Sequence, residues 1–369
     1  MRGICACVVL IAAAMAAAQS PAPAPQVWTM QDSGTTAGLR GIDSVDGTVA
    51  WASGTGGTVL RTTNGGAHWT RCAVPDAAKD GATLDFRGVQ AWDAQTAIVM
   101  ASGPGDKSRL YKTMDGCRTW RLALKNPDKD GFWDALYFDH NSGWLLGDPV
   151  RGMFTLFVSS DAGRRWIRQH NEGLRATSSS QGAFAASNSS LVAIFGSAVF
   201  GAGGGSVYSL TEAEVCVDDC SLEESNLDGR KDKWERKPAL SRGNADSSGV
   251  FSIGARRKLK GAPLGSTVLI AVGGDYTRPN ESAGTAAWSS DGGAHWTAST
   301  IPPHGYRSAV QWSAPLQAWI TVGTNGSDIS RDGRFAAQHK NACSSHRLQY
   351  KTHPVAKRVD RAGTNIGDY

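Results

Sequence analysis

A short motif recurs along the chain and constrains the fold more than any other feature of the sequence. A Ser or Thr is followed two positions later by Asp or Asn, and a Trp stands five residues after that acid or amide. Asp and Asn side chains accept hydrogen bonds from nearby backbone N–H groups, and a following Gly tolerates positive φ. Each copy is therefore predicted to form a turn between two strands, with its Trp packed between neighbouring sheets. The copies contain Asn64 and Trp69, Asp115 and Trp120, Asp161 and Trp166, Asp291 and Trp296, and Asp332 without a Trp.

The spacing of these motifs predicts a ring of repeated units. Trp69, Trp120 and Trp166 are 51 and 46 residues apart, and a period of this length is typical of a propeller or a solenoid. Two more strand patterns precede each turn, which gives a four-stranded unit. The predicted fold is therefore an all-β propeller of four-stranded blades. Six units are legible, at residues 37–74, 83–125, 131–170, 180–238, 245–300 and 304–336.

Composition agrees with many short strands and argues against nucleic acid as a partner. The chain has 44 Gly and 13 Trp, residues that suit strands joined by tight turns. Its net charge of +5 comes entirely from the segment after Gly333, which contains seven Lys or Arg residues and two Asp residues. A nucleic-acid binder should carry its basic excess as a face of the folded body, so no nucleic-acid partner is expected.

The two ends of the chain are predicted to differ from the body. Residues 1–18 read as a signal peptide, with an apolar run too short to cross a bilayer comfortably, and residues 19–26 as a Pro/Ala-rich tether. The propeller is assigned to residues 27–333, with Trp28-Thr29 as an outer strand that closes the last blade. Residues 334–369 are either a degenerate last blade or a functional basic tail. The chain is therefore expected to be periplasmic or secreted, without a transmembrane segment once matured.

Five cysteines follow the predicted signal peptide. In an oxidising compartment they favour disulfides, and the pairing that we predict is Cys72–Cys117 and Cys216–Cys220, which leaves Cys343 unpaired. Zinc is the competing reading, but no Cys or His lies two to four residues from Cys117, and His68 alone lies that close to Cys72. No metal site and no cofactor are predicted.

Longer stretches resemble a known family. The boxes resemble BNR/Asp-box repeats, and LRGI…AWASGTGGTVLRTTNGGAHW, YKTMDGCRTW, WLLGDPVRGMF, AVGGDY and GYRSAV…GTNGSDISRDG together are similar to the photosystem II stability/assembly factor-like family of exported propellers. The resemblance spans about residues 28–333. It implies a seven-bladed propeller that acts as a binding or assembly factor without reaction chemistry. The chain departs from the family pattern after Gly333, where the seventh blade would lie.

The predicted binding residues come from the ends of the first and second strands, which lie on one face of a propeller. Arg40, Arg87, Asp134 and Arg307 occupy equivalent positions near the starts of first strands, and Asp148, Asp275 and Tyr276 follow second strands. Converging arginines can clamp a carboxylate, a phosphate or an acidic peptide. The alternative is that these charges pair with one another and stabilise the channel wall.

Catalysis is not predicted from the remaining residues. A sialidase-like Arg-Ile-Pro motif and a Gly-x-Ser-x-Gly elbow are both absent from the sequence, and no catalytic residue is assigned. Nothing in the spacing selects Asp134 with Asp148 or Asp275 as a glycosidase pair. The expected function is a monomeric, non-catalytic propeller that binds a protein or peptide. The alternative is a glycan-binding or glycosidase-like propeller, which would need Tyr276 and Tyr306 at the channel mouth.

Overall fold

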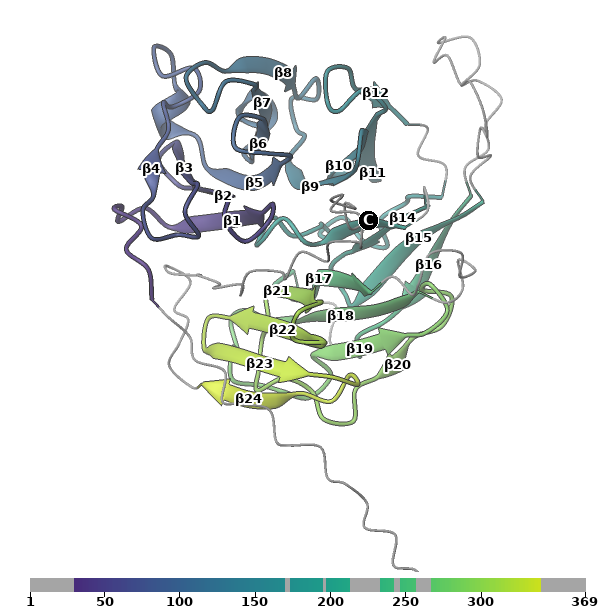
Figure 1. The fold of residues 1–369 in the computed structure, drawn as a ribbon. Coiled ribbons are helices and arrows are strands. Elements are labelled where there is room, and N and C mark those ends of the chain that lie inside the picture. Colours follow the sequence, from purple (N-terminus) through teal and green to yellow (C-terminus); the bar gives the residue numbers. More distant parts are fainter. Residues whose placement is uncertain are drawn as a thin grey trace, which may run out of the picture.

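The chain folds into six antiparallel sheets of four strands each, as the computed structural model shows (Figure 1). The all-β architecture predicted from the sequence is confirmed, and the only helices described are two short 3-10 turns, η1 (Gly81–Thr83) and η2 (Gly105–Lys107). In this described part, no helix is long and apolar enough to span a membrane. The structure describes residues 30–169, 173–194, 197–212, 233–241, 246–256 and 267–339.

The first three sheets each use four strands that are consecutive in the chain and pair in that order. Sheet 1 contains β1 (Leu39–Ser44), β2 (Ala50–Gly54), β3 (Thr58–Thr62) and β4 (Thr70–Arg71). Sheet 2 contains β5 (Phe86–Ala91), β6 (Ala97–Ala101), β7 (Arg109–Thr113) and β8 (Arg121–Lys125). Sheet 3 contains β9 (Trp133–Asp139), β10 (Ser142–Val150), β11 (Met153–Ser159) and β12 (Ile167–Arg168).

The last three sheets repeat the same order. Sheet 4 contains β13 (Leu191–Ile194), β14 (Ser197–Gly201), β15 (Ser206–Glu212) and β16 (Lys233–Pro238). Sheet 5 contains β17 (Ser248–Arg256), β18 (Val268–Asp275), β19 (Ala286–Ser289) and β20 (Thr297–Ala298). Sheet 6 contains β21 (Ala309–Ser313), β22 (Ala318–Gly323), β23 (Gly326–Ser330) and β24 (Ala336–His339).

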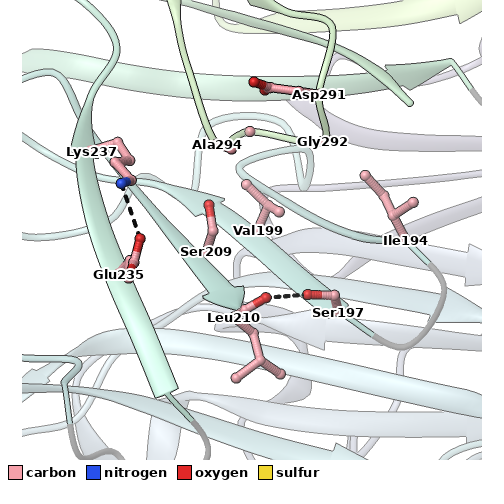
Figure 2. Close-up of a pocket in the computed structure, with 11 residues that line it drawn as sticks. Ile194, Ser197, Val199, Ser209, Leu210, Glu235, Lys237, Asp291, Gly292 and Ala294 are labelled. Atoms are coloured by element: carbon pink, nitrogen blue, oxygen red, sulfur yellow. Dashed lines mark hydrogen bonds and ion pairs between the residues drawn. The ribbon is translucent and has the colours of Figure 1, made fainter. Parts of the chain in front are cut away.

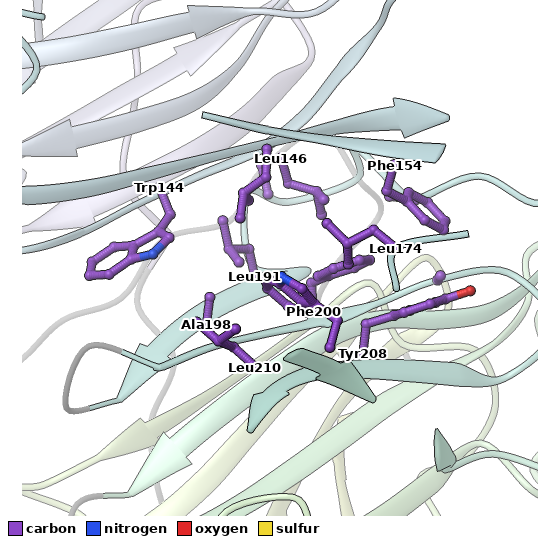
Figure 3. Close-up of a cluster of buried hydrophobic side chains, with 14 of the residues drawn as sticks. Trp144, Leu146, Phe154, Leu174, Leu191, Ala198, Phe200, Tyr208 and Leu210 are labelled. Atoms are coloured by element: carbon purple, nitrogen blue, oxygen red, sulfur yellow. The ribbon is translucent and has the colours of Figure 1, made fainter. Parts of the chain in front are cut away.

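Apolar side chains between consecutive sheets form the core. Five clusters of buried residues occupy the five joints from sheets 1–2 to sheets 5–6. At the joint of sheets 3 and 4, Phe154 lies edge-on to Phe200, which stacks on Tyr208 with ring centroids 4.9 Å apart (Figure 3). Gly201 lets the next sheet approach, because a Cβ there would lie 2.4 Å from a methyl group of Val250. Burial of these faces holds the sheets together.

Two predictions about closure of the ring need correction. The resemblance implied seven blades, but the described residues form six four-stranded sheets. Trp28-Thr29 was predicted to supply the outer strand of the last blade; these two residues lie outside the described part of the chain. The outer strand of sheet 6 is β24, which pairs with β23 and comes from the C-terminal side of the repeat. The sequence pattern missed this strand because residues 336–339 contain no Trp.

The repeated motif forms a hydrogen-bonded turn between the third and fourth strands. In the second copy, the Thr113 hydroxyl donates to Asp115 Oδ1 over 2.9 Å and accepts the Cys117 N–H, while Asp115 Oδ1 also accepts the Thr119 N–H. Asn64, Asp161 and Asp291 accept the same two bonds, and Asp332 accepts the N–H of Arg334. These contacts satisfy backbone donors that a tight turn otherwise leaves unpaired.

The Trp of each motif lies against a neighbouring segment. Trp120 meets Trp51 of sheet 1 edge-on, at 6.5 Å between ring centroids, and Trp166 meets Phe138 at 5.7 Å. Trp69 donates its indole N–H to Gln31, and Trp296 packs against the cluster between sheets 4 and 5.

The predicted Cys72–Cys117 disulfide is present and joins sheet 1 to the turn of sheet 2. Both cysteines are buried within the cluster between these sheets. The other predicted pair, Cys216–Cys220, lies outside the described residues, as does Cys343.

Candidate functional site

The predicted binding residues lie on one face of the ring, which we call the rim face. It carries the starts of the first strands, the ends of the second strands, and the loops that lead from one sheet to the next. In sheet 1, Leu39 at the start of β1 pairs with Gly54 at the end of β2, and Phe86 pairs with Ala101 in the same way in sheet 2. Neighbouring sheets therefore bring their Arg and Asp side chains to the same side.

Residues 183–190 lie inside the ring, where they bond to several sheets. The fourth predicted unit starts at residue 180, but the first strand of sheet 4 begins only at Leu191, and the segment before it crosses the ring; we call residues 183–190 the crossing segment. Asn188 shows how it fits: its Oδ1 accepts the Leu136 N–H at 2.7 Å, and its φ of +62° is tolerated by Asn. A Cβ on Gly88 would lie 2.7 Å from the same oxygen. Further bonds from the segment reach Arg87, Asp148, Ser252 and Ser308.

Arg40 and Arg87 lie on either side of Asp85, the last residue before β5. Arg87 Nε donates to Asp85 Oδ2 over 2.8 Å, and Arg40 Nε lies 3.8 Å from Asp85 Oδ1. Arg87 Nη1 also donates to the Ala185 carbonyl at 3.1 Å. The two arginine side chains remain 35% and 29% exposed, so both still have donors available to a ligand.

The loop that carries Asp85 is anchored by a buried arginine in sheet 2. Arg109 binds Asp80 with both terminal nitrogens, at 2.7 and 3.0 Å, and Lys107 Nζ also donates to this carboxylate. Hydrogen bonds from Lys107 and Arg109 lower the pKa of Asp80 to about 2. Two-pronged binding fixes geometry as well as charge, so the loop holds Asp85 in a defined place.

Asp134 is buried next to the half-buried Asp148, near enough to Arg87 to feel its charge. Asp134 is 2% exposed and lies close enough to Asp148 for the charge of Asp148 to act on it. Asp148 Oδ1 accepts the Ala183 N–H at 2.9 Å. Burial raises the pKa of Asp134 well above its ordinary value, and the neighbouring Asp148 charge raises it further. Burial also raises the pKa of Asp148. Two neighbouring carboxylates cannot both ionise easily, so the folded state favours a proton on Asp134.

This pair should make stability depend on pH. The folded chain holds the Asp134 proton more tightly than the unfolded chain, whose pKa is near 3.8. The free energy of unfolding therefore falls as pH rises above that value toward the folded pKa. Asp134→Asn keeps a neutral group of similar shape and does not titrate. The free energy of unfolding of the variant, relative to that of the wild type, should therefore be higher at pH 7 than at pH 4. Urea unfolding at both pH values measures this, and an equal difference at the two would contradict it.

An aromatic cluster lies on the same face, next to the crossing segment. Phe184 stacks on Phe251 with ring centroids 3.6 Å apart, and Phe251 meets both Tyr276 and Tyr306 edge-on. Tyr306 is only 4% exposed, whereas Tyr276 is 53% exposed. The sequence pattern selected Tyr276 but missed Phe184 and Phe251, because residues in the crossing segment follow no repeat.

Asp275 and Arg307 are engaged in their own contacts. Asp275 is buried, and bonds from the hydroxyl and N–H of Thr277 lower its pKa. Arg307 is 1% exposed; its Nε donates to Asp328 at 2.7 Å and its Nη1 to the Tyr306 carbonyl. The predicted set is therefore split: Arg40, Arg87, Asp134 and Asp148 meet, while Arg307 is part of the interior. Within the described ranges, His, Cys, Asp and Glu side chains do not gather in groups of three that could hold a metal ion.

Solved structures of other proteins share the fold of this chain. The chain is similar in fold to YCF48. The structure of YCF48 from Cyanidioschyzon merolae matches with a TM-score of 0.52 and 17% identity, over 84% of this chain and 88% of that one. A structure described as YCF48 bound to D1 peptide matches with a TM-score of 0.49 and 16% identity, over 83% and 84%. The GH74 xyloglucanase from Xanthomonas campestris matches at 0.47 and 17%, over 85% of this chain and 46% of the enzyme. No family model and no curated protein matches the chain.

Proposed function

We propose that this chain is a binding propeller that holds an extended, acidic segment of a partner protein across its rim face. The binding residues are Arg40, Arg87, Phe184 and Tyr276, which we call the rim surface. Arg40 and Arg87 would take carboxylates of the partner, and Tyr276 would take an apolar side chain. Tyr and Arg are the residue types that most often dominate the affinity of protein interfaces.

The crossing segment is the observation that supports this proposal. Ala185 accepts a bond from Arg87, and its neighbour Phe184 stacks on Phe251 beneath Tyr276. One short stretch of chain thus connects the arginines of sheets 1 and 2 to the aromatic cluster of sheet 5. Because this stretch lies inside the ring, the proposed ligand lies across the rim face and not through the ring. An extended peptide has that shape.

The sequence resemblance to exported assembly factors is consistent with such a role, and the fold shared with YCF48 is compatible with it. Export belongs to the proposal as well, since it rests on residues 1–18, which the structure does not describe. N-terminal sequencing of protein recovered from the periplasm should begin at Gln19. A mature chain that retains Met1 would remove this part of the proposal.

The glycosidase alternative finds little support in the carboxyl pair. Glycosidases that use two carboxyl groups hold them about 5–9.5 Å apart, to leave room for the sugar and, in inverting enzymes, a water molecule. Asp134 and Asp148 are instead close enough for each to affect the pKa of the other, and a Cβ on Gly182 would lie 2.6 Å from Asp148 Oδ1. Such close packing at the pair does not favour a glycosidic bond between the two carboxyl groups.

Binding of short peptides tests the rim surface. Two labelled peptides of the same length, one alternating Glu with Leu and one alternating Gln with Leu, would be titrated with the folded protein by fluorescence anisotropy. The Glu peptide should bind about tenfold tighter, because one charge-assisted hydrogen bond is worth at least that ratio. Arg40→Gln should remove most of the preference, and Tyr276→Ala should weaken both peptides.

A matched control separates local from general charge effects. Arg164 is exposed on the turn of sheet 3, away from the rim face, so Arg164→Gln should leave the preference unchanged. Far-ultraviolet circular dichroism would establish that each variant is folded. The proposal fails if wild type and Arg40→Gln distinguish the two peptides equally.

A further inference from the structure

A groove lies at the joint of sheets 4 and 5, on the face opposite the rim. It encloses about 180 Å³ between strands β14–β16 of sheet 4 and residues 291–294, in the turn between β19 and β20 (Figure 2). Ile194, Val199 and Leu210 supply its apolar lining, and Glu235 and Lys237 supply its charged edge. The proposed rim surface does not involve any of these residues.

The groove exists because one position in sheet 4 carries a small side chain. On the third strand of each sheet, one residue faces the turn of the next sheet, two positions beyond a buried apolar residue. Strand pairing identifies the equivalent positions, because in each sheet this residue pairs with the corresponding residue of the second strand. In sheets 1 to 5 they are Arg61, Lys112, Val158, Ser209 and Trp288. Ser209 is the smallest, and its second-strand partner Val199 is smaller than Trp51, Ile98, Trp144 or Ile270.

Two of these equivalent side chains are cations that bind the next sheet. Lys112 Nζ donates to the carbonyl of Ala162, the residue after Asp161, at 2.6 Å. Arg61 Nη1 donates to the Ala94 carbonyl at 2.7 Å. Gly292 follows Asp291 just as Ala162 follows Asp161, and it lines the groove. Sheets 1 and 2 therefore use this position to place an alkyl stem between sheets and a cation against the next sheet.

The polar groups of the groove suit the same occupant. Ser209 is 7% exposed and its hydroxyl oxygen has no hydrogen-bond partner, a state that costs free energy in a buried group. Glu235 lies 3.0 Å from the ammonium of Lys237 at the edge of the groove, and the Asp291 carboxylate in the turn is bonded to Ser289 and His295. In Figure 2, Ser209 points toward the turn, with Glu235 and Lys237 to one side. A cation with a flexible apolar stem would satisfy these groups.

We propose that this groove binds an arginine or lysine side chain of a partner polypeptide. The stem lies against Val199 and Leu210, and the charged group meets Ser209, Glu235 and the Gly292 carbonyl. At the joint of sheets 2 and 3, Lys112 of the chain itself occupies the equivalent place. In the groove, a side chain of another molecule would do so. It lies on the opposite face from the rim surface and does not depend on it.

Peptides that differ only in charge test the site. Four capped tripeptides, Gly-X-Gly with X as arginine, lysine, citrulline or norleucine, would be titrated by isothermal calorimetry, and chemical-shift changes would be followed at Ser209 and Gly292. Arginine and lysine should bind at least tenfold tighter than their neutral counterparts. Lysine separates an ammonium preference from a guanidinium preference.

Two substitutions in the groove should move the affinity in opposite directions. Ser209→Lys supplies the missing side chain from within, as Lys112 does in sheet 2, so it should abolish peptide binding and raise the melting temperature. Lys237→Met removes the competing cation and should tighten the binding of both cationic peptides without affecting citrulline. Lys79→Met, at an exposed lysine on the rim face, is the matched control.

Each result supports or overturns the site. The proposal is overturned if none of the four peptides binds at millimolar concentration, if charged and neutral peptides bind equally, or if a folded Ser209→Lys variant binds as the wild type does. Shift changes confined to residues outside the groove would also overturn it. The rim surface would be unaffected by any of these outcomes, because its peptides and variants are different.

Discussion

Asp328→Ala is expected to lower the free energy of unfolding by about 3–5 kcal/mol, the usual cost of leaving a buried charge without its partner. Arg307 and Asp328 have side chains that are 1% and 0% exposed, and Arg307 Nε donates to Asp328 at 2.7 Å. Asp328 also accepts bonds from His304. Urea unfolding followed by tryptophan fluorescence measures the loss.

Two further variants separate the cost of an orphaned charge from the cost of lost packing. Combining Arg307→Met with Asp328→Leu removes both charges while keeping volume, so it should recover most of the stability. Lys79→Ala removes a pair in which the lysine is 75% exposed, and it should cost less than about 1 kcal/mol. A double variant as unstable as Asp328→Ala would show that the ion pair itself contributes the stability.

The second large effect concerns the Cys72–Cys117 disulfide. The bond joins residues 45 positions apart, and loop-closure entropy gives such a cross-link about 4 kcal/mol of stabilisation through the unfolded state. Cys72→Ala with Cys117→Ala should therefore lower the free energy of unfolding by about that amount. The double variant would be compared with wild type in urea, after mass spectrometry has shown the linked peptides in the wild type. An unchanged midpoint would contradict the prediction.

The repeated motif was enough to predict the fold class and most of the strand order. Each Asp or Asn with its hydroxyl partner marks one turn between third and fourth strands, because the hydrogen bonds are local in sequence. The motif alone did not decide between the six units seen in the sequence and the seven blades that the family resemblance implied. Beyond Asp332 the motif has no Trp, and β24 is a strand that only its pairing with β23 reveals.

The candidate site was predictable where it rests on equivalent positions in the repeat. Arg40 and Arg87 converge because they occupy the same place in consecutive sheets. Burial of Arg307 was not predictable from its own position, since its partner Asp328 lies on the third strand, 21 residues away. The groove beside Ser209 could have been found from the sequence. Alignment of Ser209 with Arg61 and Lys112 shows a small side chain where sheets 1 and 2 have a long one.

Residues 183–190 also affect how the ring comes apart. In a solenoid, each unit touches only its immediate neighbours, so the ends can fray independently. Here one stretch bonds to residues of sheets 2, 3, 5 and 6 through Arg87, Leu136, Ser252 and Ser308. Detaching any one of these sheets breaks a bond to that shared stretch, so the inner strands should lose amide protection together, at one rate, in hydrogen exchange.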